Sequence, residues 1–316
     1  MRSAKTFPAR VGPKHHLVVW SSLEDYELES YLAALSEVFP DVLVTLVRTP
    51  TGELADQLRR HDLGDWPPQL IFGTAATILS EPAIAELLAP ASISAAPATG
   101  PRARWVAASG FRNAVAICGP ALAGRGLPIP ETWAMLAEPR YRGLVAFPDP
   151  AMSGAGTLAL AALVQKLGPD AAWPVIAGIK RNAAAFPASS WSCAKAALDA
   201  ATPIAVSVEI ACRRLADQEA SIRVVIPGDA SAVEFEGFAA LAGAAEPELC
   251  QEILEWSVGA ASQAIARRWR KVTLDRSETA RADLLALGSF ALDHERASRE
   301  RAAIVARFTA LESSPS

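Results

Sequence analysis

In the first quarter of the chain, short apolar runs alternate with segments whose apolar residues recur at helical spacing. The apolar runs 16–20, 42–47 and 69–72 predict buried strands. Between them, the segments 25–39 and 52–61 repeat apolar residues every three or four positions and predict helices. This alternation of strand and helix predicts a parallel sheet, and ligands of such sheets bind beyond the carboxyl ends of the strands.

A second alternation of the same kind occupies the middle of the chain. It comprises predicted strands at 144–147, 204–209 and 222–226, and predicted helices after Ser153 and at 170–180. A loop rich in Ala, Pro, Ser and Gly at 89–102 precedes it, together with predicted strands at 104–108 and 115–118. The tail 247–311 has few Gly or Pro breaks and predicts helices.

The two alternations predict two lobes. We expect residues 15–108 plus 226–316 to form lobe 1, and residues 109–225 to form lobe 2. Two segments of chain would then cross between the lobes. Such an arrangement is typical of a hinge with the ligand cleft between the lobes.

The composition is that of a globular protein. The chain has 316 residues, of which 51% are hydrophobic, and a formal net charge of −4. No basic stripe or polybasic cluster is present, so we expect no nucleic-acid partner. No apolar run is long enough to span a membrane, and residues 1–14 lack the apolar core of a signal peptide.

The residue types that carry catalysis and metal binding are sparse. The spacing of Cys118, Cys193, Cys212 and Cys250 matches no zinc signature; we expect buried thiols, with one or two disulfides as the alternative. The nucleophile elbow, the zinc-protease motif, the phosphate-binding Walker loop and the dinucleotide fingerprint are all missing. We therefore expect no enzyme activity, no catalytic residue, no metal site and no cofactor.

The stretch 147–157, FPDPAMSGAGT, is the most informative part of the chain. Two prolines stiffen an extended entry, Ser153 is a good helix N-cap, and Gly154 and Gly156 allow close approach to the backbone. The helix that follows begins with backbone amides that have no partner inside the helix. Together these features predict a binding site for an anion.

The longer stretch 126–156, GLPIPETWAMLAEPRYRGLVAFPDPAMSGAG, resembles the substrate-binding proteins of ABC importers. The branch it is most similar to comprises receptors for ferric iron, hexose phosphates, 2-aminoethylphosphonate, thiamine and polyamines. Weaker similarities lie at 17–22 (LVVWSS), 39–54 and 70–76 (LIFGTAA). The sequence departs from the family pattern at Cys118-Gly119-Pro120, where Asn-Thr-Asp is common, and at Ala155, where Thr is usual.

The resemblance implies an α/β fold of the type II periplasmic binding protein, with parallel-rich central sheets, a two-segment hinge and ligand capture by lobe closure. The implied partners are a small-molecule ligand and the membrane-embedded permease of an ABC importer, and we expect a monomer. The implied location is periplasmic or extracytoplasmic. A ligand sensor of the same fold, acting in a signalling system, is the alternative role.

The resemblance also implies which loops face the ligand. Carried onto this chain, the ligand-binding candidates are Ser21, Ser22, Thr49, Thr51, Gly52, Thr74 and Ala75 in lobe 1, and Ser153, Gly154, Ala155, Gly156, Thr157 and Glu209 in lobe 2. The ligand-facing interpretation of Ser21 and Ser22 competes with simple helix capping.

Two residue patterns bear on the class of ligand. The adjacent tyrosines that the ferric-iron receptors carry after the strand near 204–210 are replaced here by Val206-Ser207-Val208-Glu209, which argues against Fe(III). Glu209 could accept a ligand ammonium or form an ion pair with Arg112, Arg213 or Arg214. We therefore expect a phosphate- or phosphonate-bearing ligand, with a cationic ligand such as thiamine or a polyamine as the alternative.

Overall fold

The computed structural model describes residues 4–93, 96, 98–274, 289–290 and 292–312. Its backbone divides into two compact units. Unit 1 is Met1–Gly110 with Phe235–Arg281, and unit 2 is Phe111–Glu234 with Ala282–Ser316. The chain therefore passes between the units three times, once more than the two crossings expected from the sequence. Each unit is an α/β structure, as predicted.

Unit 1 is built on a sheet in which three neighbouring strands are parallel. These are β2 (His15–Ser21), β3 (Val42–Arg48) and β4 (Leu70–Ala75), with β2 in the centre. Two strands that the sequence analysis did not predict extend it in antiparallel orientation: β1 (Ala4–Phe7) on β3 and β12 (Ser231–Ala240) on β4. The short strands β5 (Ala98–Thr99) and β6 (Val106–Ala107) pair with one another, and β6 also pairs with β12.

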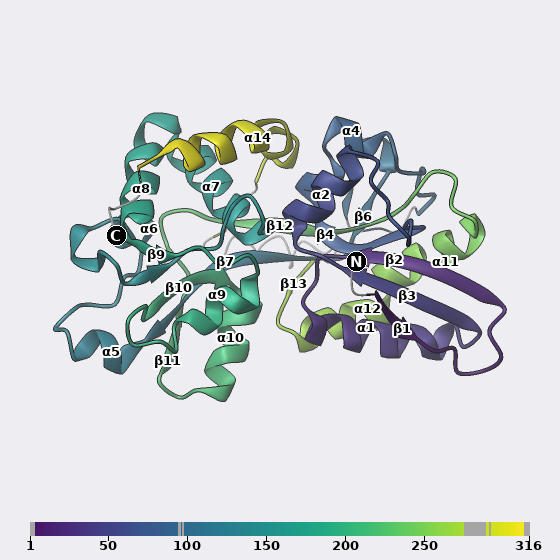
Figure 1. Cartoon of the computed structure of the whole chain (residues 1–316), viewed down its shortest axis with the longest axis horizontal. Helices are drawn as coiled ribbons and strands as arrows, with labels where there is room; N and C mark the ends of the chain where they lie inside the picture. The colour runs from purple at the N-terminus through teal and green to yellow at the C-terminus, as the bar shows by residue number, and fades with distance from the viewer. Residues whose placement is uncertain (1–3, 94–95, 97, 275–288, 291, 313–316) are drawn as a thin grey trace. The chain divides into compact units, whose positions relative to one another are not determined.

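Helices cover both faces of this sheet. Helices α1 (Asp25–Val38) and α12 (Ala260–Arg268) lie on one face, and α2 (Thr51–Arg59) with α4 (Pro82–Ala85) lies on the other (Figure 1). The main core joins the sheet to the apolar sides of α1 and α11 (Pro247–Val258), through residues such as Tyr31, Leu35, Phe72 and Ile253. Helix α1 has an apolar face because its apolar residues, such as Tyr31 and Leu35, recur at helical spacing, as the sequence predicted.

Unit 2 repeats the plan on a second sheet. Strand β10 (Ile204–Val208) lies between β8 (Val145–Ala146), which is parallel to it, and β7 (Ser109–Cys118), which is antiparallel. The outer strands are β9 (Ala183–Ala185), parallel to β8, and β11 (Ile222–Val225), antiparallel to β7. The described helices here are α5 (Gly119–Ala123), α6 (Trp133–Leu136), α7 (Gly154–Leu167), α8 (Pro169–Asn182), α9 (Ser190–Ala196), α10 (Glu209–Gln218) and α14 (His294–Ala310).

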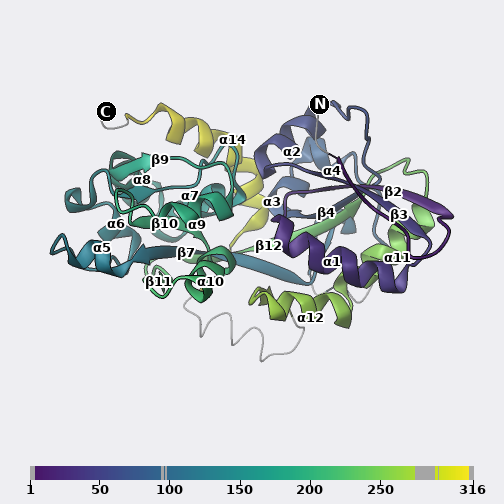
Figure 2. The ribbon, with the colours of Figure 1, turned by 60° about the horizontal axis from the view of Figure 1, so that its bottom comes forward.

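Helix α14 corrects the expected lobe assignment of the tail. The sequence analysis placed residues 226–316 in lobe 1, but α14 packs on α7 in unit 2 (Figure 2). Phe308 stacks on Phe147, and the Lys180 ammonium of α8 donates to the carbonyls of Phe308, Thr309 and Leu311. Because these carbonyls end α14 without helical partners, the buried lysine caps the helix and fixes it to unit 2.

The remaining short elements follow the same division. Helix α3 (Ala76–Leu79) and the strand β13 (Val272–Thr273) belong to unit 1, where β13 pairs with Gly110 and Ser109 of β7. Strand β14 (Ser289–Phe290) pairs with the start of β12 in unit 2. Two 3₁₀ turns lie at Pro101–Ala103 and Pro139–Tyr141. No helix in the described ranges combines the length and apolarity that a bilayer crossing requires.

Candidate functional site

The candidate residues of unit 1 lie at the carboxyl ends of its parallel strands. Ser21 ends β2, Thr49 follows β3, and Thr74 and Ala75 end β4. Because β2, β3 and β4 are parallel, these positions share one edge of the sheet. The Ser22 hydroxyl donates to Thr74 Oγ1 over 2.9 Å, so the fold brings two of the predicted loops into direct contact.

Several of these side chains are already engaged within unit 1. The Ser21 hydroxyl is fully buried, donates to the Phe72 carbonyl over 2.6 Å and accepts a bond from the Leu23 amide. Thr49 Oγ1 lies 3.3 Å from the Pro50 carbonyl. Thr51 and Gly52 form the first turn of α2, whose N-cap residue is Pro50. Ser21 thus joins two strand ends, whereas Ser22 and Thr51 are half-buried and Thr74 is 2% exposed.

The candidate residues of unit 2 cluster where β8 and β10 end. Ser153 is the N-cap of α7, a helix of 14 residues, and Gly154, Ala155, Gly156 and Thr157 form its first turn. Glu209 is the first residue of α10, not the last residue of a strand as the sequence analysis expected. Because β8 and β10 are parallel neighbours, α7 and α10 both begin at the same edge of the sheet.

The backbone amides at the start of α7 have the character of an anion site. The Ser153 amide donates to the Asp149 carbonyl, and the Thr157 amide donates to the Ser153 carbonyl. Between them, the amides of Gly154, Ala155 and Gly156 have no backbone acceptor among the described residues. We call Ser153, Gly154, Ala155 and Gly156 the 153–156 turn.

The Ser153 side chain is the most distinctive member of this turn. It is 4% exposed, and its hydroxyl caps no amide of α7. Within the part of the chain that the structure describes, that hydroxyl has no hydrogen-bond partner. The hydroxyl and the three neighbouring amides, which have no backbone acceptor, are therefore available to a ligand at the start of α7.

Gly156 and Thr157 serve the local fold. A Cβ atom on Gly156 would lie 2.4 Å from the Pro148 carbonyl oxygen, so the absence of a side chain lets the 148–150 segment pack against α7. Thr157 Oγ1 lies 3.2 Å from the Pro150 carbonyl and 3.1 Å from the Ser153 carbonyl. Both residues hold the loop against the helix through these contacts.

Glu209 is bound on both sides by arginines. Its Oε2 accepts from Arg112 Nε and its Oε1 from Arg213 Nε, each over 2.6 Å. Burial alone would raise the pKa of Glu209, but hydrogen bonding and charge from Arg112 and then Arg213 bring the pKa below its ordinary value. The structure therefore has the ion pair that the sequence analysis gave as one of two alternatives for Glu209.

The sequence analysis missed one residue at this edge. Asn113 lies opposite Val208 in the β7–β10 pairing, 3% exposed, and its Nδ2 donates to the Ala155 carbonyl of the 153–156 turn. A lone Asn near the start of a predicted strand carried no signal of this contact.

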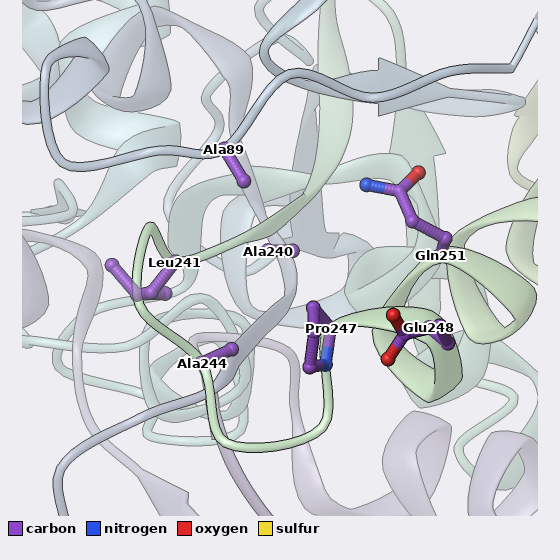
Figure 3. Close-up of a pocket in the computed structure, with 7 residues that line it drawn as sticks. All are labelled: Ala89, Ala240, Leu241, Ala244, Pro247, Glu248 and Gln251. Carbon is purple, nitrogen blue, oxygen red and sulfur yellow. The ribbon is translucent and has the colours of Figure 1, made fainter.

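Two hollows lined by described residues contain none of these side chains. One, of about 170 Å³, is lined by Ala89, Ala240, Leu241, Ala244, Pro247, Glu248 and Gln251 of unit 1 (Figure 3). The side-chain amide of Gln251 in this hollow already makes two hydrogen bonds: Nε2 donates to the Pro90 carbonyl, and Oε1 accepts from the Ser92 amide. A second hollow in unit 2 is lined mainly by α5 and the 220–223 segment. Neither contains a predicted site residue.

Comparison with known proteins identifies the family. Residues 121–281, about half of the chain, match the family model described as "Bacterial extracellular solute-binding protein". The chain belongs to this family. Members of this solute-binding family bind small-molecule ligands and deliver them to ABC permeases, and they act outside the cytoplasm. They are solute-binding proteins and not enzymes.

Solved structures of other solute-binding proteins share the fold. The fructose-6-phosphate-bound AfuA of Actinobacillus pleuropneumoniae is 18% identical with a TM-score of 0.81, over 94% of this chain and 98% of its own. The ABC-transporter substrate-binding protein of Agrobacterium tumefaciens is 18% identical with a TM-score of 0.82, over 98% of both chains.

Iron-bound HitA of Pseudomonas aeruginosa is 16% identical with a TM-score of 0.75, over 93% of this chain and 99% of its own. At these identities the likeness establishes the type II periplasmic binding protein fold of this solute-binding protein and leaves its ligand open. No curated protein sequence matches the chain.

Proposed function

We propose that this solute-binding protein captures a small anion that carries a phosphate or phosphonate group, and delivers it to an ABC importer. The observation that carries the proposal is the 153–156 turn. There the Ser153 hydroxyl, which has no described partner, adjoins three amides without a backbone acceptor at the start of a 14-residue helix. Amides and hydroxyls at a helix start favour an anion through both hydrogen bonding and the helix dipole.

The charged groups at the start of α10, at the same edge of the sheet, support an anion over a cation. Arg112 and Arg213 share the single carboxylate of Glu209, so the three side chains carry a net charge of about +1. A carboxylate held by two guanidinium groups is a poor acceptor for a ligand ammonium, because breaking those charge-assisted bonds is costly. This disfavours the cationic-ligand alternative in unit 2.

Unit 1 has candidate polar groups of its own. Ser22, Thr74, Thr49 and Thr51 stay candidates for contacts to other parts of the ligand, and Ala75 and Gly52 for its passage close to the backbone. Closure of the two lobes on the ligand, which the family resemblance implies, is part of this proposal.

A thermal-shift screen tests the proposed ligand class. Inorganic phosphate, hexose phosphates and aminoalkylphosphonates should raise the melting temperature by mass action, and thiamine and polyamines should not. Replacement Ser153→Ala should weaken binding of the active anion about tenfold or more, since a hydrogen bond to a charged acceptor contributes about 1.5–3 kcal/mol.

Ser257→Ala is the control, because Ser257 is also a buried serine, but it lies in unit 1 and its hydroxyl donates to the Leu254 carbonyl. This variant should lose stability and keep its anion affinity. Stabilisation by thiamine or a polyamine alone, or equal anion affinity of Ser153→Ala and the wild type, would refute the proposal.

A further inference from the structure

Asn113 joins the 153–156 turn to the central sheet of unit 2. Its Nδ2 donates to the Ala155 carbonyl over 2.9 Å and to the Ser207 carbonyl of β10 over 3.3 Å. Both partners are carbonyl oxygens and accept only, so the amide NH₂ group must face them. One buried side chain therefore spans the first turn of α7 and the strand that leads into α10.

The contact extends beyond α7. Ser207 is fully buried, and its hydroxyl donates to the Ser190 carbonyl at the start of α9 over 2.6 Å. Through Asn113 and Ser207, the first residues of α7 and α9 are connected to the end of β10. The network consists of buried bonds to backbone carbonyls, and such bonds fix backbone position more firmly than exposed ones.

We propose that Asn113 is the positioning residue of the anion site, a role that rests on the proposed function of the 153–156 turn. Asn113 does not bind the anion with its NH₂ group, because both hydrogens are taken by backbone carbonyls. It holds the Ala155 peptide so that the amides of Gly154, Ala155 and Gly156 point to one place before a ligand arrives. Because the turn is already ordered before the ligand binds, its ordering does not reduce the free energy of binding.

Unit 2 offers a matched control for this role. Asn182 at the end of α8 is also buried, at 2% exposed, and its Nδ2 also donates to two backbone carbonyls, those of Leu136 over 2.8 Å and Glu138 over 2.7 Å. Asn113→Ala and Asn182→Ala thus remove the same chemistry from the same unit. The two variants should lose similar stability, and only the first should disturb the 153–156 turn.

The experiment measures binding of inorganic phosphate and methylphosphonate to the full chain by calorimetry. It also records the amide NMR signals of Gly154, Ala155 and Gly156 in the ligand-free protein. We expect Asn113→Ala to bind the anion about tenfold more weakly and Asn182→Ala to bind it within about twofold of the wild type. The three amide signals should move in Asn113→Ala and stay in place in Asn182→Ala. Asn113→Ser, which retains a hydroxyl, replaces Asn113→Ala if the alanine variant does not fold.

The outcomes separate this inference from the proposed function. If the wild type binds no anion, the proposed function fails, and the ligand-free amide signals alone decide whether Asn113 positions the turn. If the wild type binds and both asparagine variants bind equally well or equally poorly, the positioning role is refuted while the anion site stands. Unmoved amide signals in the Asn113 variant also refute it.

Discussion

Replacement of Lys271 by methionine should destabilise unit 1 strongly, because the lysine is a buried cation between two buried carboxylates. The Lys271 side chain is fully buried, and its Nζ lies 2.6 Å from Glu27 Oε2 of α1 and 2.6 Å from Glu236 Oε2 of β12. Ser109 of β7 also donates to Glu236 over 3.0 Å. The cluster ties a helix to two strands at the edge of unit 1.

The magnitude follows from what the substitution leaves behind. Methionine fills most of the lysine volume, so the main cost is the loss of the counter-charge for Glu27 and Glu236. Removing one partner of a buried ion pair costs about 3–5 kcal/mol. For a unit of this size the melting temperature should fall by roughly 6–20 °C.

The pH dependence provides a second signature. Burial raises the pKa of Glu236, and the Lys271 charge counteracts part of that rise. A carboxyl whose pKa is higher in the folded than in the unfolded state binds more protons when folded, so stability falls as the pH rises through that interval. Without Lys271 the interval should extend to higher pH, and the variant should be weakest near pH 8 and should recover towards pH 5.

The assay is urea denaturation of both proteins from pH 5 to pH 8. Lys5→Met is the matched control, because Lys5 of unit 1 makes an exposed ion pair with Asp25 at 3.5 Å, and such pairs contribute about 0–1 kcal/mol. The triple variant Lys271→Met/Glu27→Gln/Glu236→Gln should regain most of the lost stability. The reasoning is refuted if Lys271→Met costs no more than Lys5→Met at pH 8, or if its cost is independent of pH.

Two other predictions concern unit 2. Glu209→Gln should cost about 3–5 kcal/mol at pH 7, because it removes one charge of the buried Arg112–Glu209 ion pair. Since the folded pKa of Glu209 is lowered, the wild-type advantage should shrink as the pH falls below about 4, and a pH-independent difference in urea midpoints would contradict this. Gly156→Ala should cost about 1–3 kcal/mol, because its Cβ would lie 2.4 Å from the Pro148 carbonyl oxygen. Gly119→Ala, whose Cβ would meet nothing closer than 3.7 Å, is the control and should be well tolerated. Equal melting temperatures of the two variants would argue against the tight contact.

The parallel core of unit 1 could be predicted from the sequence because each of its strands is a continuous apolar run. β12 was missed for the opposite reason. Its sequence places Glu234 and Glu236 among apolar residues, which mimics a polar turn, yet both glutamates are 2% exposed. Only the partners brought by the fold, such as Lys271 for Glu236, make these buried charges acceptable, and those partners are distant in sequence.

The sequence predicted the local part of the candidate site but not the contacts between residues distant in sequence. The 153–156 turn is local, so Ser-Gly-Ala-Gly before an apolar helix was sufficient to place it. The contact of Asn113 with Ala155 joins residues 42 positions apart, and no spacing rule points to it. The tail was assigned to the wrong lobe because helical periodicity identifies an apolar face but not its partner, which for Phe308 is Phe147 in unit 2.

The partners of Glu209 change the interaction that we expect it to make with a ligand. An isolated carboxylate at the start of α10 would attract the cationic end of a ligand. With Arg112 and Arg213 at 2.6 Å, the same carboxylate is neutralised, and the excess charge of the group is positive. α7 begins at the same edge of the sheet with the Ser153 hydroxyl and three amides that have no backbone acceptor. The positive charge of the Glu209 group and the positive end of the α7 dipole would therefore both attract an anion. A ligand that carries both charges would therefore place its anionic group in unit 2, and its cationic group would need a partner other than Glu209.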